Sequence, residues 1–198
     1  MNIFYLDSNP IKSAELHCDK HVVKMIIEYA QLMSTAHRVL DGEEYVDRTA
    51  NNRCIKRWCL ADQHMETVVY KASHINHPSN IWTRSSDSHY QFVYDMFSAL
   101  CNEYTHRYGR VHLTEKKLKD ILQHLPNNIA SSDFTEPPQA MPADVKTSNT
   151  VDAYQNYYRV YKKDFAKWTD RETPAFMKNI SGKENLSKYI YSEELNVR

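Results

Sequence analysis

The chain has 198 residues, with 25 Lys and Arg against 25 Asp and Glu, so its formal net charge at pH 7 is zero. This length predicts one domain with its own hydrophobic core. The charge balance excludes a protein that holds nucleic acid by bulk positive charge. The three glycines are spaced so that neither a dinucleotide-binding fingerprint nor a P-loop can be written, and their scarcity disfavours a hairpin-rich β fold.

Cysteine usage and the first residues bear on the cellular compartment. The four cysteines form no C-x-x-C pair, and reduced thiols are their simplest interpretation. The start MNIFYLDSNP lacks the basic and apolar regions of a secretory signal, and no apolar run approaches the length of a membrane span. We therefore expect a cytoplasmic protein without a membrane partner, which for a phage-encoded chain means the cytoplasm of the bacterial host.

The N-terminal part of the chain predicts a short extended arm followed by one long helix. The apolar run Asn2–Leu6 is typical of an arm or an edge strand. Residues 7–9 offer helix-capping side chains, Pro10 suits a first helical turn, and the pattern then continues to Leu40 before Gly42. Apolar residues lie on nearly every side of this helix, which indicates a central, buried position.

The rest of the chain predicts shorter helices joined by loops, and the segment 43–58 gives no clear pattern. The later expectations are a helix over 62–71, a loop over 74–80, a helix from Ser85 or Ser86 to Gly109, a helix from Thr114 that stops at Pro126, a long Pro-containing loop over 126–148, an aromatic helix from Tyr154 to Trp168, and a polar tail over 177–198. Together these elements predict a compact all-α fold of one domain over residues 1–198.

One polar stripe on the long helix is the strongest candidate for a functional site. A polar stripe on a buried helix must either be satisfied inside the protein or face a cleft. If it faces a cleft, Glu28 serves as acid or base and Lys24 is its charge partner. Alternatively, the stripe is the solvated face of the helix, and this pair is an ordinary ion pair one turn apart. The residues within about 40° of His17 on a helical wheel are His21, Lys24, Glu28, Gln31 and Thr35.

The histidines permit a second interpretation, as metal ligands. His17 and His21 lie one turn apart, and His74 and His77 could complete a ligand set. No H-E-x-x-H motif accompanies them. We expect no metal site.

The segment 77–84 lies just before a predicted helix start and carries an aromatic ring and a cation. Arg84 could hold a phosphate there, and Trp82 could stack on a base. The alternatives are a core tryptophan and a surface ion pair. The later aromatic stripe, from Tyr154 to Trp168, is interpreted as core rather than as a platform for nucleic acid.

The order of these elements resembles the pyrimidine-dimer DNA glycosylase family, the endonuclease V type of phages and its bacterial relatives, in which the chain looks like a divergent phage-type member. The local similarities are AELH at 14–17, RVLDG at 38–42, His77-Pro78 with Arg84, and RETPAF at 171–176. The resemblance covers most of the chain, although each motif is short.

This resemblance implies a compact all-α fold whose central helix ends near the active site. It also implies cleavage of the N-glycosidic bond in duplex DNA, followed by strand scission. The family uses an N-terminal α-amine as nucleophile and a glutamate on the first long helix. Here Glu28 is the carboxylate deep in that helix, and Asn2, which disfavours removal of the initiator Met, follows Met1.

We therefore expect an enzyme that acts at a pyrimidine base or its N-glycosidic bond, in DNA or in a nucleotide, without a cofactor. The alternatives are a non-catalytic helical binding protein, with an exposed patch formed by the Pro-rich loop and the tyrosines, and a metal-dependent hydrolase that uses the histidines. The expected catalytic residues are Glu28, Lys24, His21 and His17, and the expected substrate-binding residues are Lys20, Gln31, His77, Trp82 and Arg84.

Overall fold

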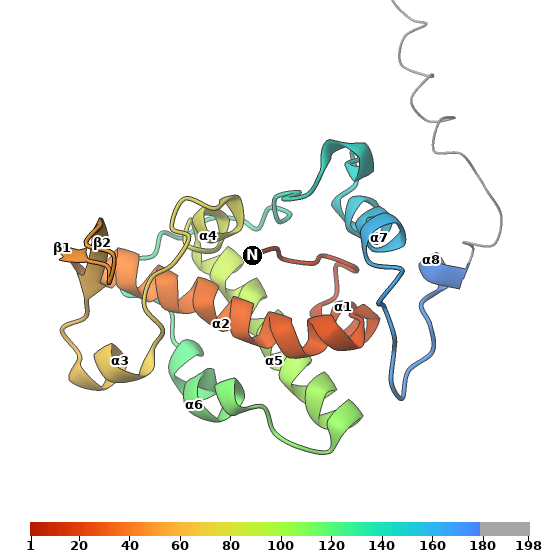
Figure 1. Ribbon diagram of the computed structural model, residues 1–198, viewed down its shortest axis with the longest axis horizontal. Coiled ribbons are helices and arrows are strands. Elements are labelled where there is room, and N and C mark those ends of the chain that lie inside the picture. The colour runs from red at the N-terminus through yellow and green to blue at the C-terminus, as the bar shows by residue number, and fades with distance from the viewer. Residues whose placement is uncertain (179–198) are drawn as a thin grey trace, which may run out of the picture.

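The computed structural model describes residues 1–178, which are mostly helical and include one small sheet (Figure 1). The expectation of a mostly helical fold is confirmed, and the two strands are an addition that the sequence pattern does not predict. Of the polar tail expected over 177–198, only the first two residues lie within the described part of the chain. The elements are α1 (Pro10–Leu16), α2 (Asp19–Asp41), β1 (Glu43–Arg48), β2 (Cys54–Cys59), α3 (Gln63–Val68), α4 (Pro78–Thr83), α5 (Asp87–Tyr108), α6 (Leu113–Leu122), the 3-10 turn η1 (Ala143–Val145), α7 (Thr150–Tyr161) and α8 (Ala175–Lys178).

The prediction of one continuous helix over 10–40 is wrong at His17, whose extended backbone separates α1 from α2. The Nδ1 atom of His17 lies 2.6 Å from the carbonyl oxygen of Ser13, the acceptor that its own backbone N–H would use in a continuous helix. The backbone N–H of Asp19 donates instead to the carbonyl of Lys167 at 2.8 Å. A side chain and a distant segment thus replace two helical hydrogen bonds.

Helices α2 and α5 cross at the centre of the molecule and contribute much of its core (Figure 1). The start of α5 is capped by Ser86, whose Oγ accepts a hydrogen bond from the backbone N–H of His89. Its end is capped by Gly109, which has a left-handed φ of 62°. Both caps are those that the sequence predicts. Core side chains without exposed surface on these two helices include Tyr29, Met33, Tyr90 and Phe97.

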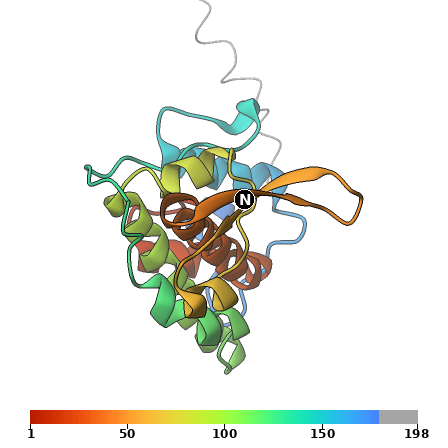
Figure 2. The same ribbon diagram turned by 90° about the vertical axis from the view of Figure 1, so that its left-hand side faces the viewer.

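Strands β1 and β2 form an antiparallel hairpin that projects from the helical body (Figure 2). Most of its side chains are exposed. The sequence therefore shows no alternation of apolar and polar residues, which is why the strands escape prediction. In the turn, Asn52 has a φ of 59°, a left-handed conformation that Asn tolerates better than most residues with a side chain.

The first six residues form an extended arm that lies in the core, outside the sheet. Side chains satisfy its backbone: the N–H of Phe4 donates to the Tyr29 hydroxyl at 3.1 Å, and the N–H of Leu6 donates to Ser13 Oγ at 3.2 Å. The amide of Gln155 donates to the carbonyl of Leu6 at 3.1 Å. These bonds fix the arm, and both views place the N-terminus beside α4 (Figures 1 and 2).

Three other boundaries differ from the sequence expectations. The loop expected over 74–80 ends earlier, because Pro78 occupies the first turn of α4. The aromatic helix expected over 154–168 begins and ends earlier, so its last two aromatic rings lie beyond α7. The helix expected over 62–71 is reduced to α3. The long loop over 126–148 is irregular as predicted, apart from the turn η1.

Candidate functional site

Glu28, in the middle of α2, lies between two amines. Its Oε1 atom is 3.1 Å from Nζ of Lys24, and its Oε2 atom is 4.0 Å from the α-amino nitrogen of Met1. The side chains of Glu28 and Met1 are 14% and 5% exposed, whereas that of Lys24 is 67% exposed. A sheltered carboxylate beside a sheltered amine can accept a proton from that amine and return it.

His77, the residue that precedes α4, lines an open groove of about 800 Å³. Burial lowers the pKa of His77, and the positive charges of the Met1 amine and His74 lower it further, against the opposing charge of Glu28. His77 thus lines the groove and feels the charges of the amine and the carboxylate, which do not line it themselves. Its other lining residues include Pro138, Met141, Lys146 and Tyr157.

Aromatic rings and lysines surround the groove and its neighbourhood. The Nζ atom of Lys162 lies 4.4 Å from the ring centroid of Tyr157, and that of Lys20 lies 4.7 Å from the ring centroid of Phe165. Lys146 lines the groove itself. Lysines thus accompany the aromatic rings of this region, an arrangement that can contact an anionic ligand with a planar ring.

His17 and His21, at the other end of the predicted stripe, are buried under the arm and α7. Burial lowers the pKa of His17 to about 4, and burial together with the positive charge of His17 lowers that of His21 to about 2. The Nδ1 atom of His21 lies 2.6 Å from the Tyr158 hydroxyl, and its ring packs on Phe4 with centroids 4.3 Å apart. These two imidazoles are therefore neutral at pH 7, and both pack against Phe4 of the N-terminal arm.

The residues of the predicted stripe therefore do not share one environment, because different segments of the chain pack on different parts of it. Thr35, at its far end, accepts a hydrogen bond from the backbone N–H of Ser73 at 3.2 Å, and Gln31 is half-buried. Lys20 and Lys24 are exposed. Of the residues on this face of α2, Glu28 is the one that approaches the α-amine of Met1.

Trp82 and Arg84 lie at the far end of α4, and neither lines the groove. The Trp82 ring stacks on His89 with centroids 4.2 Å apart, and its Nε1 donates to Thr135 Oγ1 at 3.3 Å. Arg84 is half-buried, which lowers its pKa, and its Nη1 atom is buried without a hydrogen-bond partner among residues 1–178. The Trp82 side chain belongs to the contact between α4, α5 and the long loop.

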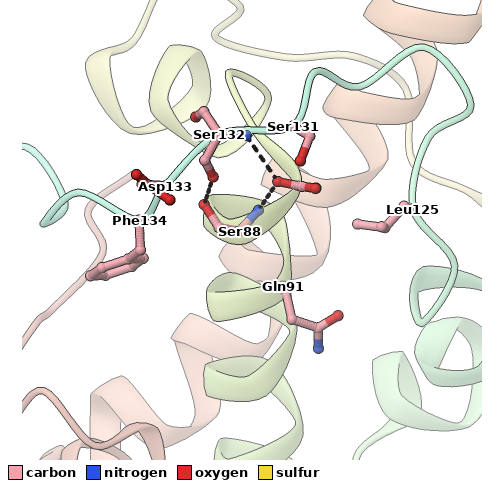
Figure 3. Close-up of a pocket in the computed structure, with 8 residues that line it drawn as sticks. Ser88, Gln91, Leu125, Ser131, Ser132, Asp133 and Phe134 are labelled. Atoms are coloured by element: carbon pink, nitrogen blue, oxygen red, sulfur yellow. Dashed lines mark hydrogen bonds between the residues drawn. The ribbon is translucent and has the colours of Figure 1, made fainter.

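A second open hollow, of about 750 Å³, lies where the long loop meets the start of α5 (Figure 3). Its polar groups bind one another: Ser88 donates to the carbonyl of Ser132 at 2.7 Å, and Asp87 accepts from the backbone N–H groups of both residues. Figure 3 shows the Ser88 side chain turned toward the backbone of Ser132. Because the carboxylate is committed to these bonds, the hollow offers weaker chemistry than the groove that His77 lines.

Within residues 1–178, no cluster of three or more His, Cys, Asp and Glu side chains has the arrangement of a metal site. His17 and His21 are sealed in the core, and Nδ1 of His77 accepts a hydrogen bond from the backbone N–H of Ser79 at 3.2 Å. The structure therefore does not gather the four histidines of the metal interpretation. No helix in the same range combines the length and hydropathy of a membrane span.

The patch required by the interpretation as a binding protein is formed by only part of the tyrosines of α7: Tyr161 is 45% exposed, and Tyr157 lines the groove with the Pro-rich loop. Tyr154 and Tyr158 have no exposed surface. The hydroxyl of Tyr154 donates to the carbonyl of Pro138 at 2.8 Å, so the aromatic stripe holds the Pro-rich loop from inside.

Comparison with protein-family models, with curated proteins and with solved structures finds no match to this chain. The site therefore has to be interpreted from its own geometry. The sequence predicts Glu28, Lys24 and His77 as site residues, and it does not indicate the groove wall at 138–146 or the ring of Tyr157. In the sequence, the concentration of prolines in the loop over 126–148 is the one feature that indicates that this segment forms an ordered side of a groove.

Proposed function

We propose that this chain cleaves the N-glycosidic bond of a pyrimidine in DNA or in a nucleotide, with the α-amine of Met1 as nucleophile and Glu28 as its proton acceptor. The observation that carries the proposal is the 4.0 Å approach of the α-amine of Met1, whose side chain is buried, to the Glu28 carboxylate, which is 14% exposed. The family that the sequence resembles pairs the same two groups. The contact between Met1 and Glu28 in the structure and the resemblance of the sequence thus support the same pair of groups.

The chemistry needs a neutral amine and a nearby base. The amine nitrogen attacks C1′ of the sugar, the bond from C1′ to the base breaks, and its electron pair leaves with the base. The proton that the attacking nitrogen loses passes to Glu28 and from there to the released base. Opening of the sugar ring, in which the ring oxygen takes up a proton from water, then gives an iminium ion, whose positive charge the Glu28 carboxylate stabilises.

The α-amine is a better nucleophile for this reaction than the other amine beside Glu28. An α-amino group is a weaker base than a lysine side chain, so more of it is neutral at pH 7. Lys24 is exposed and paired with Glu28 at 3.1 Å, which suits a role in holding the carboxylate or a substrate phosphate.

The surroundings of the pair fit an anionic substrate. Lys146 and the Tyr157 ring line the groove, Lys162 lies over that ring, and Lys24 pairs with Glu28. Lys20 lies over the ring of Phe165. These groups would contact phosphates and a base, as proteins that bind unpaired nucleotides do. Gln31, Trp82 and Arg84 lie farther along α2 and α4, where a longer nucleic acid could reach them.

Release of free base tests the proposal directly. The protein is incubated with duplex and single-stranded DNA that carry normal, modified and UV-damaged pyrimidines, and with free nucleotides, and liberated base is measured by mass spectrometry. We expect release from at least one substrate, and a fall of at least about 100-fold in Glu28→Gln, because this variant keeps the shape of the side chain and loses the proton acceptor.

A matched control separates chemistry from the loss of an ion pair. Glu115 pairs with Lys119 one turn away at 2.8 Å and is 13% exposed, close to the 14% of Glu28. Glu115→Gln should therefore leave base release unchanged. Borohydride reduction during turnover should attach the sugar to Met1, as located by peptide mapping. Attachment to Lys24, or no release from any substrate by folded protein, would contradict the proposal.

A further inference from the structure

We infer that His77 is a further catalytic residue of this site, donating a hydrogen bond from Nε2 to the pyrimidine as it leaves. The inference rests on the proposed function and extends it to the leaving group. It assigns the groove to the departing base and the region of Met1 and Glu28 to the sugar.

The first step is the orientation of the imidazole. The backbone N–H of Ser79 donates to Nδ1 of His77 at 3.2 Å, so Nδ1 must be an acceptor. A neutral imidazole that accepts at Nδ1 carries its proton on Nε2. The same bond caps α4, and Pro78 fixes φ at the first position of the helix. The hydrogen bond and the backbone therefore both restrict the orientation of the His77 ring.

The second step is the charge state of the ring. Burial and the neighbouring positive charges of Met1 and His74 lower the pKa of His77. The ring is therefore neutral at pH 7 and keeps its cap to Ser79. A neutral donor suits a leaving group that becomes negative, because it stabilises charge without quenching the nearby Glu28 carboxylate.

The third step is the position of the ring on a preformed wall. His77 and Pro78 form one side of the groove, and Gln139 and its neighbours form the other. The amide of Gln139 donates to the carbonyl of Thr147 at 2.7 Å and accepts from its N–H at 3.3 Å. The hydroxyl of Tyr154 holds the carbonyl of Pro138. The groove is thus fixed before a ligand arrives, and a donor on its wall needs no rearrangement to meet the base.

The bond changes balance without another reactant. As the amine attacks C1′, the electron pair of the glycosidic bond moves onto the pyrimidine and is shared with the carbonyl oxygen beside its ring nitrogen. The Nε2–H of His77 donates to that oxygen and keeps its proton. The proton that the amine loses reaches the base through Glu28, so neutral pyrimidine is released.

The test is His77→Asn, because Asn is among the best helix-capping residues and preserves the cap of α4. The variant lacks a donor that reaches the place of Nε2. We expect an unchanged melting temperature and KM, and a fall in kcat for base release of about 100-fold, as for loss of one preorganised donor. His106→Asn, on the exposed last turn of α5, is the matched control and should behave as wild type.

Leaving-group dependence distinguishes a donor from a structural residue. A fluorinated pyrimidine bears negative charge more easily than its parent base, so it should lose much less rate in His77→Asn than the parent does. An equal loss for both bases, or none, would overturn the inference while base release by wild type would still stand. No base release by wild type would overturn the proposed function itself.

A measurement independent of activity tests the ring directly. Nitrogen-15 NMR of the imidazole should report a neutral ring at pH 7 with its proton on Nε2. A proton on Nδ1 would contradict the inference whatever the kinetics.

Discussion

At the residue scale, the core contains imidazoles that burial keeps neutral at pH 7. His17 and His21 have no more than 6% of their surface exposed, and the Nε2 atom of His17 is buried without a partner among residues 1–178. Burial is the largest cause of the lowered pKa of both rings. The same cause lowers the pKa values of His37, His77, His89 and His112.

These rings predict a loss of stability in mild acid. A folded pKa below the unfolded value near 6.5 means that the unfolded chain binds more protons as the pH falls below 6.5. With folded pKa values of about 4 and about 2, His17 and His21 should each remove about 2 kcal/mol of stability between pH 7.5 and pH 5. Urea unfolding at the two pH values measures this loss.

The double variant His17→Gln/His21→Gln isolates their contribution, since neither replacement titrates. Its free energy of unfolding should change less between the two pH values than that of wild type, whatever its absolute stability. His106→Asn should keep the wild-type slope. An unchanged slope in the double variant would show that these two rings do not cause the acid lability.

At the element scale, the sequence predicts what local chemistry determines. Ser86 and Gly109 signal both ends of α5, and these caps act within one turn of the helix. The break at His17 depends on a carbonyl of residue 167, far along the chain, so no local pattern reveals it. The hairpin from 43 to 59 has little buried surface and therefore no periodicity to detect.

Two glycines at element ends predict different penalties. A Cβ on Gly109 would meet no atom within 4 Å, so Gly109→Ala should cost only the left-handed conformation, about 1 kcal/mol. A Cβ on Gly42, between α2 and β1, would lie 2.5 Å from the carbonyl oxygen of Arg38 and 3.1 Å from Cβ of Trp58. Gly42→Ala must displace backbone and should be the more destabilising of the two.

Thermal unfolding of both glycine variants checks this order, and proteolysis at the hairpin should increase only in Gly42→Ala. A larger loss of stability in Gly109→Ala would mean that the junction between α2 and β1 adapts without strain.

At the scale of the whole molecule, the candidate site is made by packing that the sequence does not reveal. The 3–4 spacing on α2 is enough to mark Glu28 as a polar group on a buried helix. Its approach to Met1 depends on an arm held by Tyr29 and Gln155, and its link to the groove depends on where α4 places His77. These are contacts between distant segments, so the sequence indicates the carboxylate and does not reveal the amine beside it or the groove that His77 lines.

A buried ionic network joins the segment after α7 to the helical core. The Arg107 side chain is fully buried and donates to Glu103 at 2.6 Å and to Asp19 at 2.9 Å. Arg171 donates to the same Glu103 carboxylate at 2.8 Å. Burial raises the pKa of Glu103, but the hydrogen bonds from Arg171 and Arg107 outweigh it, so the pKa lies below its ordinary value.

We expect the loss of Arg107 from this network to lower the free energy of unfolding more than the loss of a one-turn ion pair nearer the surface. Arg107→Met leaves two carboxylates without their shared partner and should cost about 3 kcal/mol in urea unfolding. Lys119→Met, which removes a one-turn pair nearer the surface, should cost less than about 1 kcal/mol. Arg107→Met combined with Glu103→Gln should cost less than the sum of the single variants, because the second change removes a buried charge that has lost one of its two arginine partners. Strict additivity would mean that Arg107 acts through packing alone, and the segment from 167 to 171 would then be held chiefly by Trp168, whose Nε1 donates to the carbonyl of Leu16 at 2.9 Å.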